Sequence, residues 1–186
     1  MNKRIIVGIS GSTGPIYGIR LLEALKNTPV ETHVIISEWA EKTIQIETDY
    51  TTAEVRALAD FVHPPKNQAA KISSGSFQTD AMVIVPCSMK TLSSVAHGFA
   101  DNLISRAADV ILKEKRQLIM VPRETPLHDI HLENMLKLSR MGVVMMPPMP
   151  AFYNKPETID DIVNHTVSRL LDQLGIDNDL VGRWLQ

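Results

Sequence analysis

A run of glycine and hydroxyl residues near the amino terminus is the stretch of this chain best suited to chemistry. Between Gly8 and Gly14 the chain reads GISGSTG, with its glycines spaced G-x-x-G-x-x-G. The run follows apolar residues 5–7 and precedes an apolar-periodic stretch over residues 16–25. A glycine-rich turn from a strand into a helix lets backbone N–H groups approach an anion, and the helix terminus adds partial positive charge. We therefore expect a phosphate-bearing ligand, although the spacing is not the G-x-G-x-x-G of nicotinamide-binding folds.

A second candidate segment reads PCSMKT over residues 86–91. Here Ser88 and Thr91 can hydrogen-bond a flavin or a nucleotide, and Lys90 can face a phosphate. Ser88 can equally serve as a simple helix cap. Cys87 is a candidate nucleophile, because a helix amino terminus lowers the pKa of a thiol, but a small buried thiol at a strand end is common.

A third segment reads PRETP over residues 122–126. There Arg123 can clamp an anion while Glu124 moves protons, and the alternative is a local surface ion pair of little energetic weight. Arg106 and Lys113 lie seven residues apart on one helical run and so share a face. Taken alone, that pair indicates only a solvent-facing surface.

Other chemistry-bearing side chains give weaker signals. The pair His128 and His131 has the spacing to share a metal ion, but no third ligand is evident, and Asp129 between them more simply begins a helix. Trp39 and Phe61 are expected in the core, and so are most of the methionines.

Alternating strand and helix patterns must position these segments. Near-continuous apolar runs predict strands over residues 4–9, 32–36, 81–85, 117–121 and 143–146. Helical patterns cover residues 15–26, 39–47, 51–61, 91–96, 101–115 and 127–140, and a last one runs from 158 to 174 with Thr158 as its N-cap and two aspartates in its first turn. Polar residues 63–75 and the proline-rich residues 147–154 are expected to form loops that wall a site.

This alternation predicts a three-layer α/β fold with a mostly parallel sheet, formed by residues 1–186 as one domain. Ligands of such sheets bind beyond the carboxyl ends of the strands. That rule selects residues 10–14, 37–38, 86–88, 123–124 and 147–153.

Composition limits the class of protein. A net charge of −2 gives no support for a nucleic-acid or anionic-membrane partner. No apolar run reaches the ~18 residues of a membrane span, and no signal peptide is evident. With a single cysteine, Cys87, no intramolecular disulfide can form. We therefore expect a cytoplasmic protein.

Several of these segments together resemble the UbiX-type flavin prenyltransferases, including the subunits associated with phenolic-acid decarboxylases. The resemblance covers nearly the whole chain and rests on GISGSTGPIYGIRLLEAL, ETHVIIS followed by IETDY, SSGSFQTDAMVIVPCSMKTLS, DNLISRAADVILKEKRQLIMVPRETPL, IHLENMLKLSRMG and MPPMPAFYNKPET. It implies a Rossmann-like or flavodoxin-like domain, assembled as a homododecamer with sites at subunit contacts.

The activity that this resemblance implies is metal-independent. Reduced FMN and dimethylallyl monophosphate, or in some members the diphosphate, would be the substrates. The enzyme would join the prenyl carbon to N5 of the flavin and close a fourth ring at C6. Prenylated FMN would then pass to a UbiD-type decarboxylase.

The resemblance also assigns residues by motif. Flavin contacts fall on Gly11, Ser12, Thr13, Ser37, Ser88, Met89, Lys90, Thr91 and Arg123. The group around the prenyl phosphate falls on Lys113, Arg123, Tyr153 and Arg169, with Arg106 of open role. Glu124 matches the carboxylate that handles phosphate protonation, and Glu47 matches the acidic residue near the reacting flavin edge.

Two departures from the family pattern are visible. Many relatives read GASGA where this chain has Gly11-Ser12-Thr13-Gly14-Pro15, so that Thr13 adds a methyl group to the loop. Some relatives carry a tryptophan before the SSGS segment, and residues 67–71 contain none.

Near the carboxyl terminus, Arg183 and Trp184 resemble a terminal Arg-Trp pair of the family. We expect Trp184 to close over a neighbouring site.

Three alternatives remain at this stage. Flavin-dependent cysteine decarboxylases of similar fold carry a P-x-M-N-x-x-M-W segment, which this chain lacks. A nicotinamide oxidoreductase would use Glu38 to bind ribose, but the glycine spacing disfavours it. A non-catalytic flavin carrier would have no use for the charged side chains of the proposed site, which are Glu47, Lys113, Arg123, Glu124 and Arg169.

Overall fold

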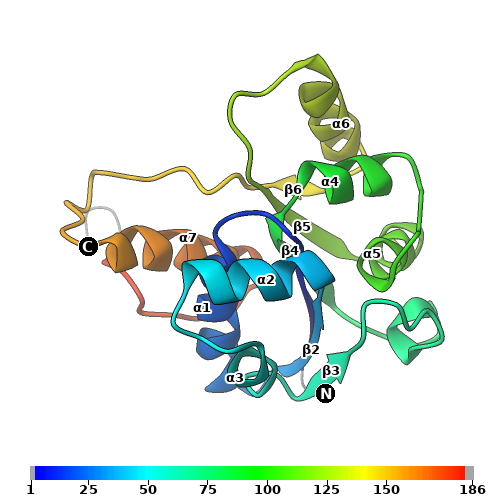
Figure 1. Ribbon diagram of the computed structural model, residues 1–186, viewed down its shortest axis with the longest axis horizontal. Helices are drawn as coiled ribbons and strands as arrows, with labels where there is room; N and C mark the ends of the chain where they lie inside the picture. Colours follow the sequence, from blue (N-terminus) through cyan, green and yellow to red (C-terminus); the bar gives the residue numbers. More distant parts are fainter. Residues whose placement is uncertain (1–2, 183–186) are drawn as a thin grey trace.

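A six-stranded, fully parallel sheet forms the centre of the molecule (Figure 1). The computed structural model describes residues 3–182. The strands are β1 (Arg4–Ile9), β2 (Glu31–Ile36), β3 (Phe61–His63), β4 (Ala81–Cys87), β5 (Gln117–Pro122) and β6 (Val144–Met145), in the order β3-β2-β1-β4-β5-β6. The strand order reverses between β1 and β4, so the loops after these two strands diverge and leave a crevice.

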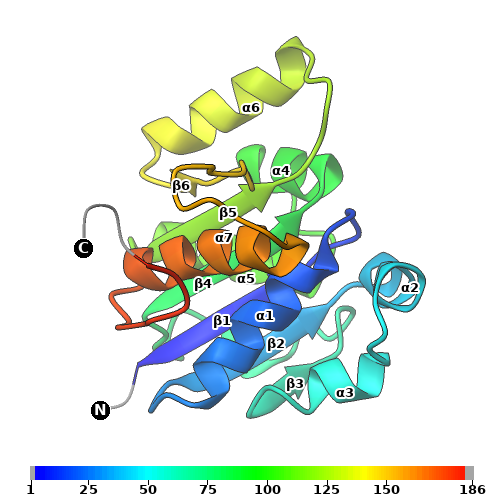
Figure 2. The ribbon, with the colours of Figure 1, turned by 90° about the vertical axis from the view of Figure 1, so that its left-hand side faces the viewer.

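Helices cover both faces of the sheet, as the alternating pattern predicts. They are α1 (Pro15–Lys26), α2 (Glu38–Glu47), α3 (Thr52–Arg56), α4 (Met89–Ala96), α5 (Leu103–Lys113), α6 (Asp129–Arg140) and α7 (Ile159–Gln173), with a 3₁₀ turn at Lys71–Ser73. One core cluster packs α1, α2, α3 and α7 on one face, and the other packs α4, α5 and α6 on the opposite face. Figure 2 shows α1 and α7 in front of the sheet and α4 and α5 behind it. The three-layer α/β prediction is confirmed.

The central strands are buried on both faces, which explains their unbroken apolar runs. Every residue of β4 is buried, and so are five of the six residues in each of β1, β2 and β5. A strand with helices on both sides has no solvent face and therefore no polar alternation. The sequence alone located these four strands to within two residues at each end.

Helix α1 begins where the glycine run ends. Gly14 has φ of 89°, a left-handed conformation that glycine adopts without strain, and Pro15 occupies the first turn. Helix α7 has the predicted N-cap, since the Thr158 hydroxyl accepts from the backbone N–H of Asp161.

Two predictions in the region of residues 51–63 are wrong. The expected helix ends at Arg56, and Phe61–His63 form the edge strand β3 beside β2. Asp60 fixes the turn between them, because its carboxylate accepts from the backbone N–H and the hydroxyl of Thr32 at 2.8 and 2.9 Å. A three-residue edge strand with two exposed side chains leaves no periodic signal.

Within residues 3–182, no helix is long and apolar enough to cross a membrane.

Candidate functional site

Ser10 joins the ends of the two strands at which the sheet order reverses. Its hydroxyl donates to the carbonyl of Pro86 at 3.0 Å and accepts from the backbone N–H of Ser88 at 2.8 Å. The side chain is almost fully buried, and its own N–H also donates to Pro86. The glycine run after β1 and the PCSMKT segment after β4 therefore meet at one place, as their strand-end positions predict.

A cavity of about 400 Å³ opens beside this junction. Its walls come from the loop after β1, the start of α2, the segment before residue 67, and the starts of α4 and α5. The lining residues are Ser10, Gly11, Ser37, Glu38, Trp39, Pro65, Lys66, Ser88, Lys90, Thr91, Asp101, Asn102 and Ile104.

The capping residues of three helices line this cavity. Ser37 accepts from the N–H of Ala40 at the start of α2, and Ser88 accepts from Thr91 at the start of α4. Asn102 accepts from two N–H groups at the start of α5. Each helix amino terminus carries a partial positive charge, so three of them around one cavity favour an anion such as a phosphate group.

Two ion pairs lie at the same cavity. The Lys66 ammonium contacts the Glu38 carboxylate at 2.6 Å, and the Lys90 ammonium contacts Asp101 at 3.0 Å. In each pair the lysine lowers the pKa of the carboxyl group through a hydrogen bond. Both pairs are open to solvent, so an entering anion can compete for the two ammonium groups.

The glycine loop itself is held closely on three sides. A Cβ atom on Gly11 would lie 2.3 Å from the Cβ of Trp39, so a larger residue cannot be placed there without a shift. The backbone N–H of Gly14 donates to Glu47 at 2.8 Å, and the hydroxyl of Ser12 donates to the carbonyl of Arg123 at 3.1 Å. Glu47 and the β5 end that carries Arg123 thus both lie beside the loop.

Arg123 and Glu124 are both exposed at the carboxyl end of β5. They do not pair with each other within the described chain, because Glu124 accepts instead from the N–H of Thr125 at 3.1 Å. The charge of Arg123 reaches Tyr17 of α1, where it opposes the rise that burial causes in the pKa of the phenol. The alternative of a simple Arg123–Glu124 surface pair is therefore wrong.

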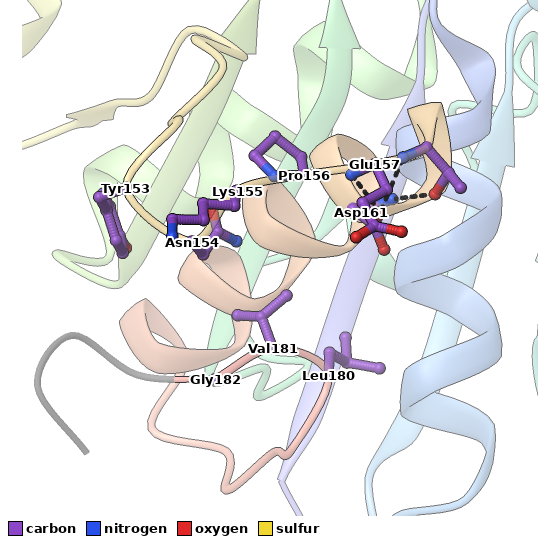
Figure 3. A pocket seen from close by; sticks show the side chains of 10 residues that line it. Tyr153, Asn154, Lys155, Pro156, Glu157, Asp161, Leu180, Val181 and Gly182 are labelled. Atoms are coloured by element: carbon purple, nitrogen blue, oxygen red, sulfur yellow. Dashed lines mark hydrogen bonds between the residues drawn. The ribbon is translucent and has the colours of Figure 1, made fainter.

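Tyr153 and Arg169 belong to a second location, along α7. The hydroxyl of Tyr153 lies 2.8 Å from Nε2 of His165, and Arg169 donates to Asp172 at 2.7 Å. Burial and the nearby charge of Arg169 lower the pKa of His165. Tyr153 also borders an open cavity of about 810 Å³ between residues 153–161 and residues 180–182 (Figure 3).

Lys113 and Arg106 lie elsewhere again, on α5. Lys113 ends this helix beside Gly75 and pairs with Glu114, while Arg106 donates to Asp109 and to the carbonyl of Ser73. The Lys113 end of α5 leads to the edge of the sheet where β5 begins, and Arg123 follows the other end of that strand. Six strand residues at ~3.3 Å each separate the two edges by about 20 Å. One copy of the chain thus does not bring Lys113 to Arg123.

One other sequence hypothesis is wrong, and the histidine pair gains no third ligand within the described chain. Cys87 is completely buried, and burial raises the pKa of its thiol, so it is not the activated nucleophile considered above. The rings of His128 and His131 stack at 3.6 Å, and Asp129 begins α6 as expected. No cluster of three or more metal-ligating side chains is found in residues 3–182.

Several exposed or cavity-lining residues were not predicted from the sequence. Trp39 and Phe61 are exposed, 67% and 40% respectively, and not in the core. Lys66 and Asn102 line the cavity, but no local sequence pattern predicts that these two segments meet there. For Asn102 one signal was available, because asparagine is a preferred N-cap and it directly precedes the helix over residues 103–113. The predicted Arg183–Trp184 pair lies outside the described residues.

Comparison with known proteins gives a consistent result. The profile of the Flavoprotein family matches residues 1–171. A probable UbiX-like flavin prenyltransferase of Escherichia coli O157:H7 is 60% identical over 182 residues, which are 97% of this chain and 92% of the relative.

Two solved structures share the fold closely. A dodecameric FMN-dependent UbiX-like decarboxylase from Escherichia coli O157:H7 has a TM-score of 0.97 and 59% identity, covering 98% of this chain and all of the other. The structure of AnUbiX (PadA1), in complex with FMN and dimethylallyl pyrophosphate, has a TM-score of 0.98 and 52% identity, covering 100% and 99%.

Proposed function

The chain belongs to the Flavoprotein family and, within it, to the UbiX-type flavin prenyltransferases, and we propose on that premise which of its residues do the work. The protein binds FMN and prenylates it. One observation supports the location of the flavin above all others. Three helix amino termini and the glycine loop surround a single cavity at the reversal of strand order.

The FMN phosphate, we propose, binds at the capping residues of this cavity. Ser37, Ser88 and Thr91 offer hydroxyl groups there, and Lys90 offers a positive charge. The remaining flavin contacts, Gly11, Ser12, Thr13, Met89 and Arg123, follow from the family motif. Ser12 and Arg123 are joined by a hydrogen bond, so a flavin along the glycine loop would lie beside the end of β5.

Reduced FMN supplies the nucleophilic N5 and C6 atoms to which the prenyl group becomes joined. Arg123 stabilises the negative charge that grows on the phosphate as the allylic C–O bond breaks and its electron pair leaves with that phosphate. Glu124, adjacent and unpaired with Arg123, delivers a proton to the leaving phosphate. Glu47 accepts a hydrogen bond from the N–H of Gly14, and its proposed place beside the reacting flavin edge follows from the family motif.

We propose that the remaining prenyl-phosphate residues come from neighbouring subunits of a homo-oligomer. The proposed assembly is a dodecamer. Within one chain, Lys113 and Arg123 lie at opposite edges of the sheet, which the six residues of β5 separate by about 20 Å. Arg169 lies on α7, at a third location, and Tyr153 precedes this helix and contacts its His165. Arg106 lies on α5 together with Lys113. Assembly of identical subunits is a simple way to unite such separated groups.

Dimethylallyl monophosphate is the proposed prenyl donor and prenylated FMN the product. A UbiD-type decarboxylase is the proposed recipient, in the cytoplasm, with residues 1–186 acting as one flavoprotein domain. These assignments rest on the family motifs and on the FMN and dimethylallyl pyrophosphate complex of the related structure.

The decisive experiment is anaerobic. Purified protein, reduced FMN and dimethylallyl monophosphate are incubated, and the flavin is analysed by mass and absorbance. A flavin heavier by one five-carbon unit, formed only with active protein, is expected. FMN binding without a mass change, even with the diphosphate, would favour the second candidate, a flavin-dependent decarboxylase like the related FMN-dependent protein of Escherichia coli O157:H7.

A mixing experiment tests the shared site. Lys113→Ala and Arg123→Ala proteins, each impaired in prenyl transfer at low donor concentration, are unfolded, mixed and refolded together. If the two residues reach one site from different subunits, some mixed sites contain both native residues, and activity at low donor concentration returns. If they act within one chain, the mixture stays as impaired as its components.

A further inference from the structure

Trp39 exposes two thirds of its side chain at the rim of the cavity. It is the second residue of α2, directly after the cap Ser37 and Glu38. No family motif quoted above assigns it a role, and a buried position was expected for it. A large indole in water is unusual enough to require a reason when it borders a binding cavity.

The base of this side chain is fixed against the glycine loop. A Cβ atom placed on Gly11 would lie only 2.3 Å from the Cβ of Trp39. The glycine loop and the first turn of α2 are therefore in direct contact at this point. The indole therefore extends from the junction between the glycine loop and the Ser37 cap. Both are proposed flavin contacts, and Trp39 lines the same cavity as Gly11 and Ser37.

Lys42 supports the ring from the same helix. Its ammonium lies 4.3 Å from the ring centroid, a cation–π contact one turn further along α2. The contact restrains the indole while leaving most of it accessible. A restrained, accessible aromatic plane is the feature that planar heteroaromatic ligands use for stacking.

We propose that Trp39 forms an aromatic wall against which the isoalloxazine ring of the flavin packs. This inference rests on the proposed placement of FMN in the cavity and adds a binding residue to it. Stacking of a heteroaromatic ring on a protein aromatic changes affinity by roughly ten- to one hundred-fold when the aromatic is removed. Trp39 contributes this to flavin affinity and takes no part in the proton transfers.

The test uses the intact oligomer and compares the tryptophan emission of the parent with that of Trp39→Phe, which retains Trp184 alone. FMN is titrated while tryptophan emission is followed, and affinity is measured separately by calorimetry. We expect saturable quenching of Trp39 emission. We expect Trp39→Leu to weaken FMN binding by ten-fold or more, and Trp39→Phe to stay within about three-fold of the parent, because a phenyl ring still stacks.

The control is Phe99→Leu, an equally exposed aromatic that does not line the cavity. It should leave FMN affinity unchanged. Light scattering on every variant checks the assembly.

The outcomes separate clearly. FMN affinity that is unchanged in Trp39→Leu, or FMN binding that leaves Trp39 emission unquenched, overturns the aromatic wall. A loss of affinity that accompanies dissociation of the oligomer overturns it as well and makes Trp39 a subunit contact. Prenyl transfer by the unmodified protein is assayed in parallel. If the protein is not a prenyltransferase, no prenylated FMN forms in that assay, whereas the FMN titrations still report whether Trp39 packs against the flavin.

Discussion

The hydroxyl of Ser12 donates a hydrogen bond to the backbone carbonyl of Arg123 at 3.1 Å, across 111 residues of sequence. This bond attaches the glycine loop after β1 to the end of β5. The loop that we assign to the flavin and the segment that we assign to the prenyl phosphate are therefore neighbours in one chain. Chemistry between the two ligands requires that proximity.

Glu124→Gln should reduce prenyl transfer by a hundred-fold or more while FMN still binds. An amide keeps the shape of the side chain but cannot donate the proton that the leaving phosphate needs, and positioned acids contribute roughly 10²–10⁴-fold. Single-turnover rates under anaerobic conditions measure the effect. Glu133→Gln, at an exposed position of α6, is the matched control and should leave the rate unchanged. Full activity in Glu124→Gln would remove the proposed role.

Arg123→Ala and Arg169→Ala should each raise the KM for dimethylallyl monophosphate by about ten-fold or more, because each loses a charge-assisted hydrogen bond to phosphate. Initial rates over a range of donor concentrations give this value. Arg140→Ala, at the exposed end of α6, serves as the control arginine. A KM that is unaltered in both site variants contradicts the clamp.

Gly11→Ala should weaken FMN binding strongly and lower thermal stability. The added methyl group would lie 2.3 Å from the Cβ of Trp39, so the loop or the start of α2 must move. Calorimetry and thermal unfolding report the two effects. At Gly182 a Cβ meets nothing within 4 Å, so Gly182→Ala should behave like the parent. Unchanged FMN affinity in Gly11→Ala would mean that the flavin does not depend on this loop geometry.

Acid should destabilise the fold through the buried pair His33 and His63. Nδ1 of His33 lies 2.8 Å from Nε2 of His63, and Nε2 of His33 lies 2.9 Å from Glu31. Burial lowers the pKa of His33, and burial together with the charge of His33 lowers the pKa of His63 to about 4. Unfolded histidines titrate near 6.5, so the unfolded chain binds more protons below that pH.

The stability from this pair should therefore be complete above about pH 6.5 and decline as the pH falls toward 4. Urea unfolding at pH 7.5, 6.0 and 5.0 measures the decline. His63→Gln should flatten the profile in this range, although its stability at pH 7.5 is lower. The exposed His97→Gln is the control and should keep the slope of the parent. A parent profile that is flat between pH 7.5 and 5.0 contradicts the prediction.

Local signals account for the parts of the fold that were predicted correctly. Strand β1 and helix α1 have the predicted bounds, because an unbroken apolar run, a glycine turn and Pro15 act within a few residues of one another. The meeting of residues 10–14 with residues 86–91 also followed from sequence, since the ends of neighbouring parallel strands share one edge of a sheet.

What the sequence by itself determined is the layered fold, the edge of the sheet that carries the site, and the motifs that place the chain in its family. Only the tertiary structure decided that Trp39 is exposed, that Lys66 and Asn102 reach the cavity, and that Lys113 lies far from Arg123. The reason is physical. Helix and strand formation depends on neighbours along the chain, whereas the exposure of a side chain and the distance between two charges depend on how separate elements pack.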